Sequence, residues 1–284
     1  MNIKRILFPV DFSERCASAV PFVALMAERH AAKVTLLTVV HPYYAGGLAG
    51  APVIDMEDLQ ESSKQELART FQTEFGGIAV DRVVEAGDPG TVIAKWAREH
   101  AVDLIMLPTH GYGPFRQLLL GSVTAKVLHD AHCPVWTDAH SGLAPDQEHL
   151  RMGGVLCAVD ASADSVRVLR WAANMAKGLG AKMRIIHAVP GLEAWPERQM
   201  DQEFEEQIRD NARQAIEKLE KAADMDVPIC VNTGTVPDVV REEAVQHNAD
   251  LVIIGRGAIQ GALGRLRTHA HAIIRNSPCP VISV

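Results

Sequence analysis

The amino-acid sequence predicts an α/β protein of two tandem domains, each a doubly wound, five-stranded parallel sheet flanked by four helices. Two observations support this prediction. The chain repeats itself at an offset of about 150 residues, and each copy alternates short apolar runs with longer segments of helical spacing. The length agrees, because 284 residues correspond to about two domains of roughly 150 residues each.

The repeat consists of four segments that recur in the same order with small insertions between them. The matching pairs are 6–13 with 155–162, 32–37 with 181–186, 102–107 with 249–254, and 132–135 with 278–281. This order indicates a tandem duplication. The polar stretch 138–152, which contains Gly142 and Pro145, is typical of a linker and predicts domains at 1–140 and 150–284.

The first copy supplies its elements in alternating order. Its expected strands cover residues 3–10, 33–40, 79–84, 104–107 and 135–137. Apolar spacing in residues 17–27 predicts the first helix, and the more charged segment 59–75 predicts the second. Asp88 and Pro89 provide an N-cap and a proline at the first helical position of the third, and an apolar stripe in 123–131 marks the fourth.

The strands are almost continuously apolar, which indicates a parallel sheet covered by helices on both faces. Right-handed crossovers then make each copy a doubly wound, Rossmann-like unit. In such sheets, ligands bind beyond the carboxyl ends of the strands, where the strand order reverses. Residues that follow the strands are therefore the first candidates for a site.

Composition and charge limit the kind of protein this is. The formal net charge of −7 and the pI near 5.9 argue against a general nucleic-acid binder. The five cysteines are odd in number and scattered, which favours reduced thiols. Residues 1–5 lead directly into an apolar strand, leaving no room for a signal peptide, and no apolar run approaches the length of a membrane span. We therefore expect a cytoplasmic protein without membrane contact.

Asp11 follows the first strand of the first copy, and Asp160 follows the first strand of the second. A carboxylate there can accept hydrogen bonds from a ribose hydroxyl or an amine. Asp11 and Ser13 are also good cap residues and can simply begin the next helix. Both interpretations stay open, and one residue can serve both.

The segment 108–125 follows the fourth strand and runs into a helix that opens at Gly121 and Ser122. Glycines allow close approach of a ligand to the backbone, and a helix N-terminus offers unpaired N–H groups to an anion. Ser122 can cap this helix or contact a phosphate oxygen. A glycine-containing loop alone is a weak signal.

These residues resemble the signature of the universal stress protein family, G-x2-G-x9-G-(S/T), followed by a helix and a strand that opens with Cys-Pro-Val. The first copy has Pro108, Gly111, Gly121 and Ser122 at this spacing, and then Cys133-Pro-Val. The resemblance covers nearly the whole chain as two domains. It implies binding of ATP or another adenine nucleotide, with or without Mg²⁺.

The resemblance also implies which residues bind the nucleotide. Asp11 and the backbone of Val39 would hold the adenosine, and the others would border the base or the phosphates. The full set is Pro9, Asp11, Val39, Leu107, Pro108, Gly111, Gly121, Ser122 and Val123. Pro108 departs from the signature, which has glycine there. Because proline lacks an N–H, one contact to the ligand can be lost.

The second copy departs further from the signature. Its equivalents of the nucleotide-binding residues are Asp160, Gly255, Gly257, Arg267 and Thr268, with Arg267 opposite Gly121 and Thr268 opposite Ser122. A bulky side chain at that glycine position predicts an occluded or degenerate site, in which Asp160 remains mainly as a cap. The alternative is a remodelled anion site, because Arg256, Arg265 and Arg267 carry guanidinium groups that suit phosphates.

The sequence contains no P-loop and no nucleophile elbow. The histidine pairs His129/His132 and His269/His271 lack the spacing of a helical zinc site, so we predict no catalytic and no metal-binding residues. Only Arg116 and Lys126 are cations near the first loop, which favours a binding protein with at most slow ATP hydrolysis. The alternatives are an interaction module that binds no nucleotide and a weak ATPase.

The resemblance further implies a nucleotide-dependent regulatory role in the stress response. It implies that the last strands, 135–137 and 281–284, associate across a two-fold axis. In a tandem chain the two domains can then pair with each other, and two chains can form a homodimer.

Overall fold

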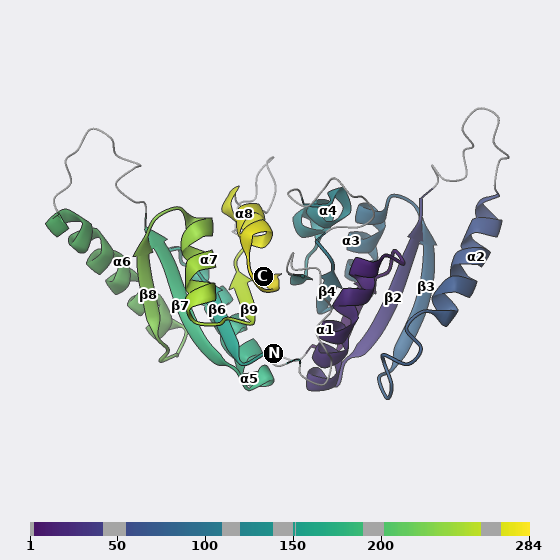
Figure 1. The fold of residues 1–284 in the computed structure, drawn as a ribbon, viewed down its shortest axis with the longest axis horizontal. Helices are drawn as coiled ribbons and strands as arrows, with labels where there is room; N and C mark the ends of the chain where they lie inside the picture. Colours follow the sequence, from purple (N-terminus) through teal and green to yellow (C-terminus); the bar gives the residue numbers. More distant parts are fainter. Residues whose placement is uncertain are drawn as a thin grey trace, which may run out of the picture. The chain divides into compact units, whose positions relative to one another are not determined.

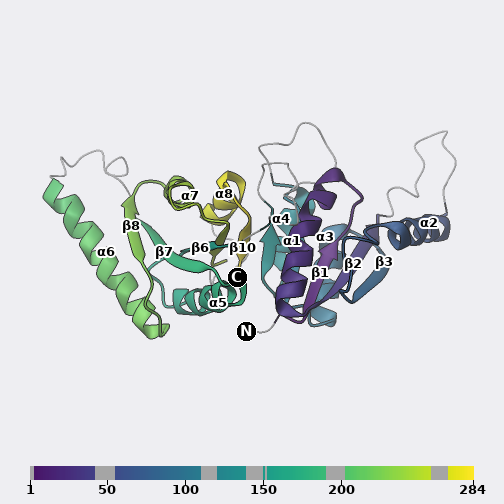
Figure 2. The same cartoon turned by 60° about the horizontal axis from the view of Figure 1, so that its bottom comes forward.

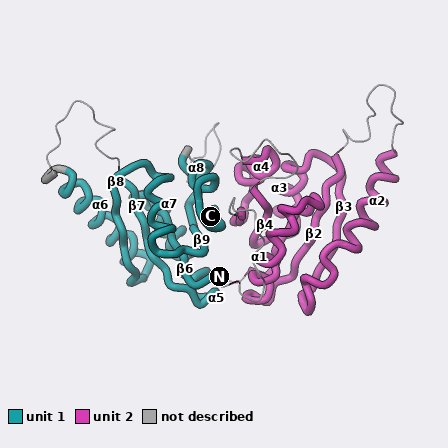
Figure 3. The backbone as a smooth tube through the Cα atoms, in the orientation of Figure 1, with its two compact units in different colours: residues 1, 139–141, 151–284 teal, residues 2–138, 142–150 magenta. Residues whose placement is uncertain are grey.

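The computed structural model describes residues 3–41, 55–109, 120–138, 150, 152–189, 202–256 and 268–284. The chain divides into two compact units (Figure 3), one made of residues 2–138 and 142–150 and the other of residues 1, 139–141 and 151–284. We call the unit containing 2–138 the first domain and the unit containing 151–284 the second domain, and describe each by itself.

The first domain is a doubly wound α/β unit (Figure 1). Its strands pair in parallel in the order β3-β2-β1-β4-β5, so the order reverses between β1 and β4. This confirms the predicted fold class and locates the crevice where such sheets bind ligands. The elements are β1 (Arg5–Pro9), α1 (Glu14–His30), β2 (Lys33–Val40), α2 (Met56–Arg69), β3 (Val80–Ala86), α3 (Pro89–Glu99), β4 (Leu104–Leu107), α4 (Ser122–Asp130) and β5 (Val135–Thr137).

The second domain repeats this architecture. Its strands pair in parallel in the order β10-β9-β6-β7-β8. Helices α5 and α6 lie on one face of this sheet and α7 and α8 on the other (Figure 2). The elements are β6 (Gly154–Ala158), α5 (Ser165–Leu179), β7 (Lys182–Val189), α6 (Gln202–Ala222), β8 (Ile229–Thr233), α7 (Val236–Gln246), β9 (Leu251–Ile254), α8 (Thr268–Asn276) and β10 (Val281–Ser283).

The duplication extends to individual hydrogen bonds at the amino ends of the strands. Asp103 Oδ2 accepts from the backbone N–H groups of Lys4 and Arg5, at 2.8 and 3.0 Å. In the second domain, Asp250 Oδ2 accepts from the N–H groups of Gly153 and Gly154, at 2.8 and 2.9 Å. Both copies therefore use an aspartate before the fourth strand to hold the start of the first.

The core of each domain lies around its central strands. All four residues of β4 and all four of β9 are buried, as expected for strands with helices on both faces. In contrast, no residue of β3 is fully buried, because β3 is the outermost strand of the first sheet. The predicted cover on both faces therefore holds for the central strands and weakens at this edge.

The second helix is shorter than predicted, since α2 ends at Arg69 rather than Phe75. Arg82 of β3 donates from Nε to the carbonyl of Leu67 and from a terminal nitrogen to the carbonyl of Thr70, at 2.9 and 3.0 Å. These bonds satisfy carbonyls that a longer helix would have used. Phe75 is buried in the turn that follows α2, so the apolar spacing of the segment 59–75 continues past the helix because Phe75 packs into the core.

None of the helices in the described part of the chain has both the length and the apolarity needed to cross a bilayer.

Candidate functional site

The candidate residues of the first domain gather at the carboxyl ends of β1, β2 and β4 and at the start of α4. Pro9 and Leu107 are the last residues of β1 and β4, and Gly121 immediately precedes α4. The reversal of strand order lies between β1 and β4, so these ends border one crevice. Gly111 falls outside the described residues, as does Arg116.

Asp11 takes part in the cap of α1 and still presents an exposed carboxylate. Its Oδ1 accepts from the backbone N–H and the hydroxyl of Ser13, at 3.0 and 2.6 Å. Ser13 Oγ in turn accepts from the N–H of Cys16, at 3.1 Å, which makes Ser13 the N-cap. Phe12, between them, has a φ of 60°, an unusual conformation for a bulky residue. The turn is thus shaped to hold the Asp11 carboxylate at the end of β1.

Val39 presents backbone groups to the same crevice. β1 ends at Pro9, paired with Leu37, and the Leu37 carbonyl accepts from Val10 N–H at 2.9 Å. Groups two residues apart on a strand point the same way, so the N–H and C=O of Val39 point to this side beyond the end of β1. A planar ligand at this position can hydrogen-bond with them.

The start of α4 is tied to the end of β4. The N–H of Gly121 donates to the carbonyl of Thr109 at 2.9 Å, and Thr124 Oγ1 donates to the carbonyl of Pro108 at 3.0 Å. No side chain among the described residues caps α4. The N–H groups of Ser122 and Val123 therefore stand at an uncapped helix N-terminus, which is suited to an anion.

Asp138 was not a candidate from the sequence, yet it anchors this arrangement. It follows β5, is only 7% exposed, and accepts from both the N–H and the hydroxyl of Thr109, at 2.7 and 2.9 Å. Burial raises the pKa of the Asp138 carboxyl above its usual value, while the Thr109 hydrogen bonds and the charge of Arg15 act in the opposite direction. The signal that could have identified Asp138 is the strand register. Leu107 pairs with Thr137, so the residues that follow β4 and β5 leave the sheet side by side.

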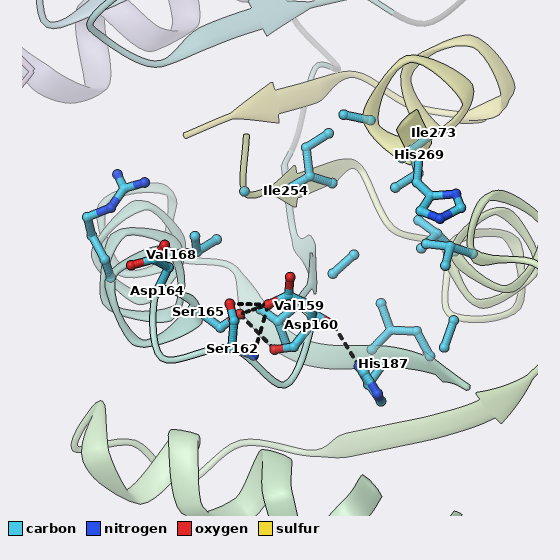
Figure 4. Close-up of a pocket in the computed structure, with 18 residues that line it drawn as sticks. Val159, Asp160, Ser162, Asp164, Ser165, Val168, His187, Ile254, His269 and Ile273 are labelled. Atoms are coloured by element: carbon cyan, nitrogen blue, oxygen red, sulfur yellow. Dashed lines mark hydrogen bonds between the residues drawn. The ribbon is translucent and has the colours of Figure 1, made fainter. Parts of the chain in front are cut away.

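In the second domain, the equivalent region contains a cavity of about 130 Å³ (Figure 4). It lies at the carboxyl ends of β6, β7 and β9, between α5, α7 and α8. Asp160 and Gly255, two of the expected equivalents of the nucleotide-binding residues, are among the residues that line it. Gly257 and Arg267 fall outside the described residues, and so does the side chain of Thr268, the first residue of α8. Occlusion by Arg267 therefore stays a prediction.

The Asp160 carboxylate is more heavily engaged than its counterpart Asp11. Its Oδ1 accepts from the N–H of Ser162 at 3.0 Å, from the Ser162 hydroxyl, and from the Ser165 hydroxyl at 2.9 Å. The third donor arises because Ser165 stands where the first copy has Cys16. Figure 4 shows Asp160, Ser162 and Ser165 together beside the cavity. Asp160 thus holds the turn before α5, whereas the N-cap of α5 is Asp164, which makes no side-chain cap bond.

Two histidines line this cavity that the sequence did not mark as candidates for ligand binding. His187 Nδ1 lies 2.8 Å from the carbonyl of Val159, which can only accept, so Nδ1 carries the proton. In the first copy, Thr38 makes the same bond to the carbonyl of Val10, at 3.2 Å. His269, in the first turn of α8, lines the same cavity (Figure 4) and stands where the first copy has Val123. The cavity therefore combines apolar walls with polar groups, as small-molecule sites do.

The remodelled anion site is partly described. Arg256 is 7% exposed and its N–H donates to the carbonyl of Val284 at 3.0 Å, whereas Arg265 and Arg267 fall outside the described residues. Within the described part of the chain, no three His, Cys, Asp or Glu side chains form a group that could hold a metal ion.

Comparison with known proteins agrees with this architecture. Universal stress protein MJ0531 of Methanocaldococcus jannaschii is 29% identical over 135 residues, covering 46% of this chain and 79% of that protein. Universal stress protein Rv2624c of Mycobacterium tuberculosis is 24% identical over 295 residues, covering all of this chain and 97% of that protein. A universal stress protein crystal structure from Archaeoglobus fulgidus shares the fold over 99% of this chain and 96% of its own, with a TM-score of 0.70 and 23% identity.

The model of the universal stress protein family matches the chain twice, at residues 2–137 and 152–284. Each match coincides with one of the two doubly wound sheets. The chain belongs to the universal stress protein family and contains two copies of its domain.

Proposed function

We propose that the first domain, residues 1–140, binds ATP or another adenine nucleotide between β1 and β4, and that the second, residues 150–284, regulates it. The observation that carries this proposal is the N-terminus of α4, which no described side chain caps and which the bond from Gly121 to Thr109 holds at the end of β4. Aligned N–H groups and the helix dipole favour a phosphate at this position.

The other candidate residues supply the remaining contacts in this proposal. Asp11 uses one carboxylate oxygen in its turn, and its remaining lone pairs can accept from ribose hydroxyls. The backbone of Val39 hydrogen-bonds with the base, which Leu107 and Pro108 border. Ser122 and Val123 contact the phosphates, together with Gly111 and any accompanying Mg²⁺.

Binding without appreciable turnover suits the charges near α4. Phosphoryl transfer needs cations placed around the transferred group. Lys126 Nζ lies 3.3 Å from Asp130 Oδ2, one turn further toward the end of α4. We therefore propose nucleotide-dependent signalling, with hydrolysis slow at most. If the protein is instead an ATPase, ADP release will scale with protein and disappear when the site is blocked.

The test is identification of small molecules released from freshly purified, denatured protein, combined with ATP-induced thermal stabilisation. Gly121→Arg should abolish both, because a bulky side chain would fill the phosphate position. The Gly121 backbone, at φ −59° and ψ 145°, accepts any residue. Gly153→Arg is the matched control, since Gly153 is exposed and an added Cβ would meet only Asp250 Oδ2, at 3.8 Å.

The expected result is about one nucleotide per chain from the wild type and from Gly153→Arg, and none from Gly121→Arg. Absence of both nucleotide and ATP-induced stabilisation in the wild type would refute the proposal and favour an interaction module. Unchanged affinity in Gly121→Arg would move the site elsewhere.

The cavity of the second domain favours a second small-ligand site there. Its volume lies below the roughly 300–1,000 Å³ of sites for drug-sized ligands, so the described walls suit a small molecule. Ala188→Phe should fill the cavity from β7. A ligand that is recovered from Gly121→Arg protein and lost from Ala188→Phe protein would support this second site, whereas recovery from both would exclude the cavity.

A further inference from the structure

Asp138 lies at one end of a chain of four hydrogen bonds that reaches the start of α4. Asp138 Oδ1 accepts from the N–H and the hydroxyl of Thr109, and the Thr109 carbonyl accepts from the N–H of Gly121. Thr124 Oγ1, one turn into α4, donates to the carbonyl of Pro108. The side chains of Asp138, Thr109 and Thr124 are all buried, so water does not compete for these bonds.

Strand register brings the two ends of this chain together. β4 and β5 are parallel neighbours, with Leu107 opposite Thr137. Asp138 and Thr109 therefore leave the same edge of the sheet side by side. Because Thr109 donates both of its groups to one carboxylate oxygen, its peptide unit is held, and its carbonyl is held facing Gly121.

The direction of the α4 N-terminus depends on this chain. The helix has no side-chain cap among the described residues, so the bonds from Gly121 to Thr109 and from Thr124 to Pro108 fix its first turn to the sheet. A carboxylate acceptor makes the bonds to Thr109 charge-assisted, and such bonds are about twice as strong as neutral ones. Loss of the Asp138 acceptor would remove two hydrogen bonds from Thr109 and weaken the link that orients the first turn of α4.

The second copy shows that the fold does not need this carboxylate. Its equivalents of Thr109, Thr124 and Asp138 are Arg256, Ala270 and Val284. There the two strand ends are joined by a backbone bond from Arg256 N–H to the Val284 carbonyl, at 3.0 Å. The strands nevertheless pair in the same order.

We propose that Asp138 is a positioning residue, which aims the N–H groups of Ser122 and Val123 at an anionic ligand through Thr109 and Gly121. This inference rests on the proposed nucleotide site and adds a buried residue that never touches the nucleotide. Ionisation of Asp138 is disfavoured by its burial, so a carboxylate here carries a folding cost that a purely structural link would avoid.

The test compares ATP dissociation constants of the full-length chain by calorimetry, with melting temperatures measured in parallel. Asp138→Ala should weaken ATP binding by about tenfold, since it removes the acceptor of two buried hydrogen bonds from Thr109. Asp138→Asn keeps an acceptor oxygen and should bind within about threefold of the wild type. Thr109→Val removes only the 2.9 Å hydroxyl bond and provides a milder variant if Asp138→Ala does not fold.

Asp103→Ala is the matched control. Asp103 also accepts two hydrogen bonds through one oxygen, but at the opposite ends of the strands. It should lower the melting temperature and leave ATP affinity unchanged. A pH series adds a second readout, because between pH 7 and 5 the wild-type affinity should fall relative to that of Asp138→Asn. Among the described residues, the charged or titratable groups facing Asp138 are Arg15 and Cys16 of α1, and the wild type and Asp138→Asn share them.

Three results would overturn the inference. ATP affinity in Asp138→Ala equal to that of the wild type would refute the positioning role alone. Equal weakening of ATP binding in Asp138→Ala and Asp103→Ala would show that lost stability, and not the orientation of the α4 N-terminus, is responsible. A wild-type chain that binds no nucleotide would refute the proposed function, and the positioning role with it.

Discussion

A buried carboxylate in the second domain allows a sharp test of how this protein tolerates internal charge. Glu243 of α7 is 2% exposed, and its Oε1 lies 3.1 Å from His247 Nε2, one turn along the helix. Its Oε2 accepts from the Cys230 thiol at 3.4 Å and from the Asn232 amide at 3.5 Å. His247 is thus the only described partner of Oε1, and the approach does not have hydrogen-bond geometry.

We predict that, in a buffer acidic enough to protonate His247, His247→Ala lowers the free energy of unfolding of the second domain by about 2 kcal/mol, because it leaves the carboxylate buried without its cation. At 3.1 Å, two unit charges interact by about 5 kcal/mol at an effective dielectric constant of 20 and by about 1 kcal/mol in water. The His247 side chain is 34% exposed, so screening places the loss toward the lower value.

The informative variant is Glu243→Met, which replaces the carboxylate by an apolar side chain of similar length. It should change stability by less than about 1 kcal/mol, because the desolvation cost disappears together with the ion pair. In the double variant His247→Ala should then be nearly neutral. The double variant would then be more stable than His247→Ala alone. Such a result shows that the two residues are coupled, because independent effects on the free energy of unfolding would add.

The assay is native-state hydrogen exchange at amides of β9, whose residues are buried and report unfolding of the second domain alone. His100→Ala is the control, measured at the amides of β4, the buried strand of the domain that contains His100. His100 occupies the same position after α3, where it stacks on Trp96 at 3.8 Å between ring centroids. It should cost less than His247→Ala, because no charge is left behind. The reasoning fails if Glu243→Met is as destabilising as His247→Ala, or if the two losses add.

Three further predictions concern the first domain. Asp88 caps α3 through the backbone N–H of its third residue, at 3.0 Å, so Asp88→Ala should cost about 1 kcal/mol, as chemical denaturation will show. Thr235, the equivalent in the second domain, makes no side-chain cap bond, and Thr235→Ala should cost less. Gly90→Ala should destabilise the packing of α3 on α4 by roughly 1–2 kcal/mol in the same measurement, because the new Cβ would lie 2.7 Å from the Lys126 side chain. Burial raises the pKa of Asp138, so its contribution to stability is present below about pH 4 and is lost as pH rises through the raised pKa. In urea unfolding between pH 4 and 7, the free energy of unfolding of Asp138→Asn should therefore increase relative to that of the wild type as pH rises.

The fold could be predicted because the relevant signals are local and occur twice. Apolar runs of strand length, the Asp88 cap and the start of α4 at Ser122 all follow from neighbouring residues. The end of α2 could not be predicted in this way. It depends on Arg82, a residue of the next strand whose guanidinium reaches the helix carbonyls only after β3 has joined the sheet.

The candidate site was predictable to the extent that it sits on strand ends. Asp11, Leu107 and Gly121 lie where the strand pattern and the family signature expected them. Asp138 was missed because its role depends on the register between β4 and β5. His187 was missed because a histidine inside an apolar strand resembles a core residue until its bond to Val159 is seen.

The two copies together separate what the fold needs from what a ligand needs. The bonds of Asp103 and Asp250 to the starting strands are present in both domains, at nearly equal distances, although no ligand is expected at that edge. At the opposite edge the copies differ, because Asp138 has Val284 as its counterpart and Cys16 has Ser165. Both sheets keep the same strand order despite these changes. The first edge therefore carries bonds that both folded domains share, and the differences at the second edge are where the two domains can bind different ligands.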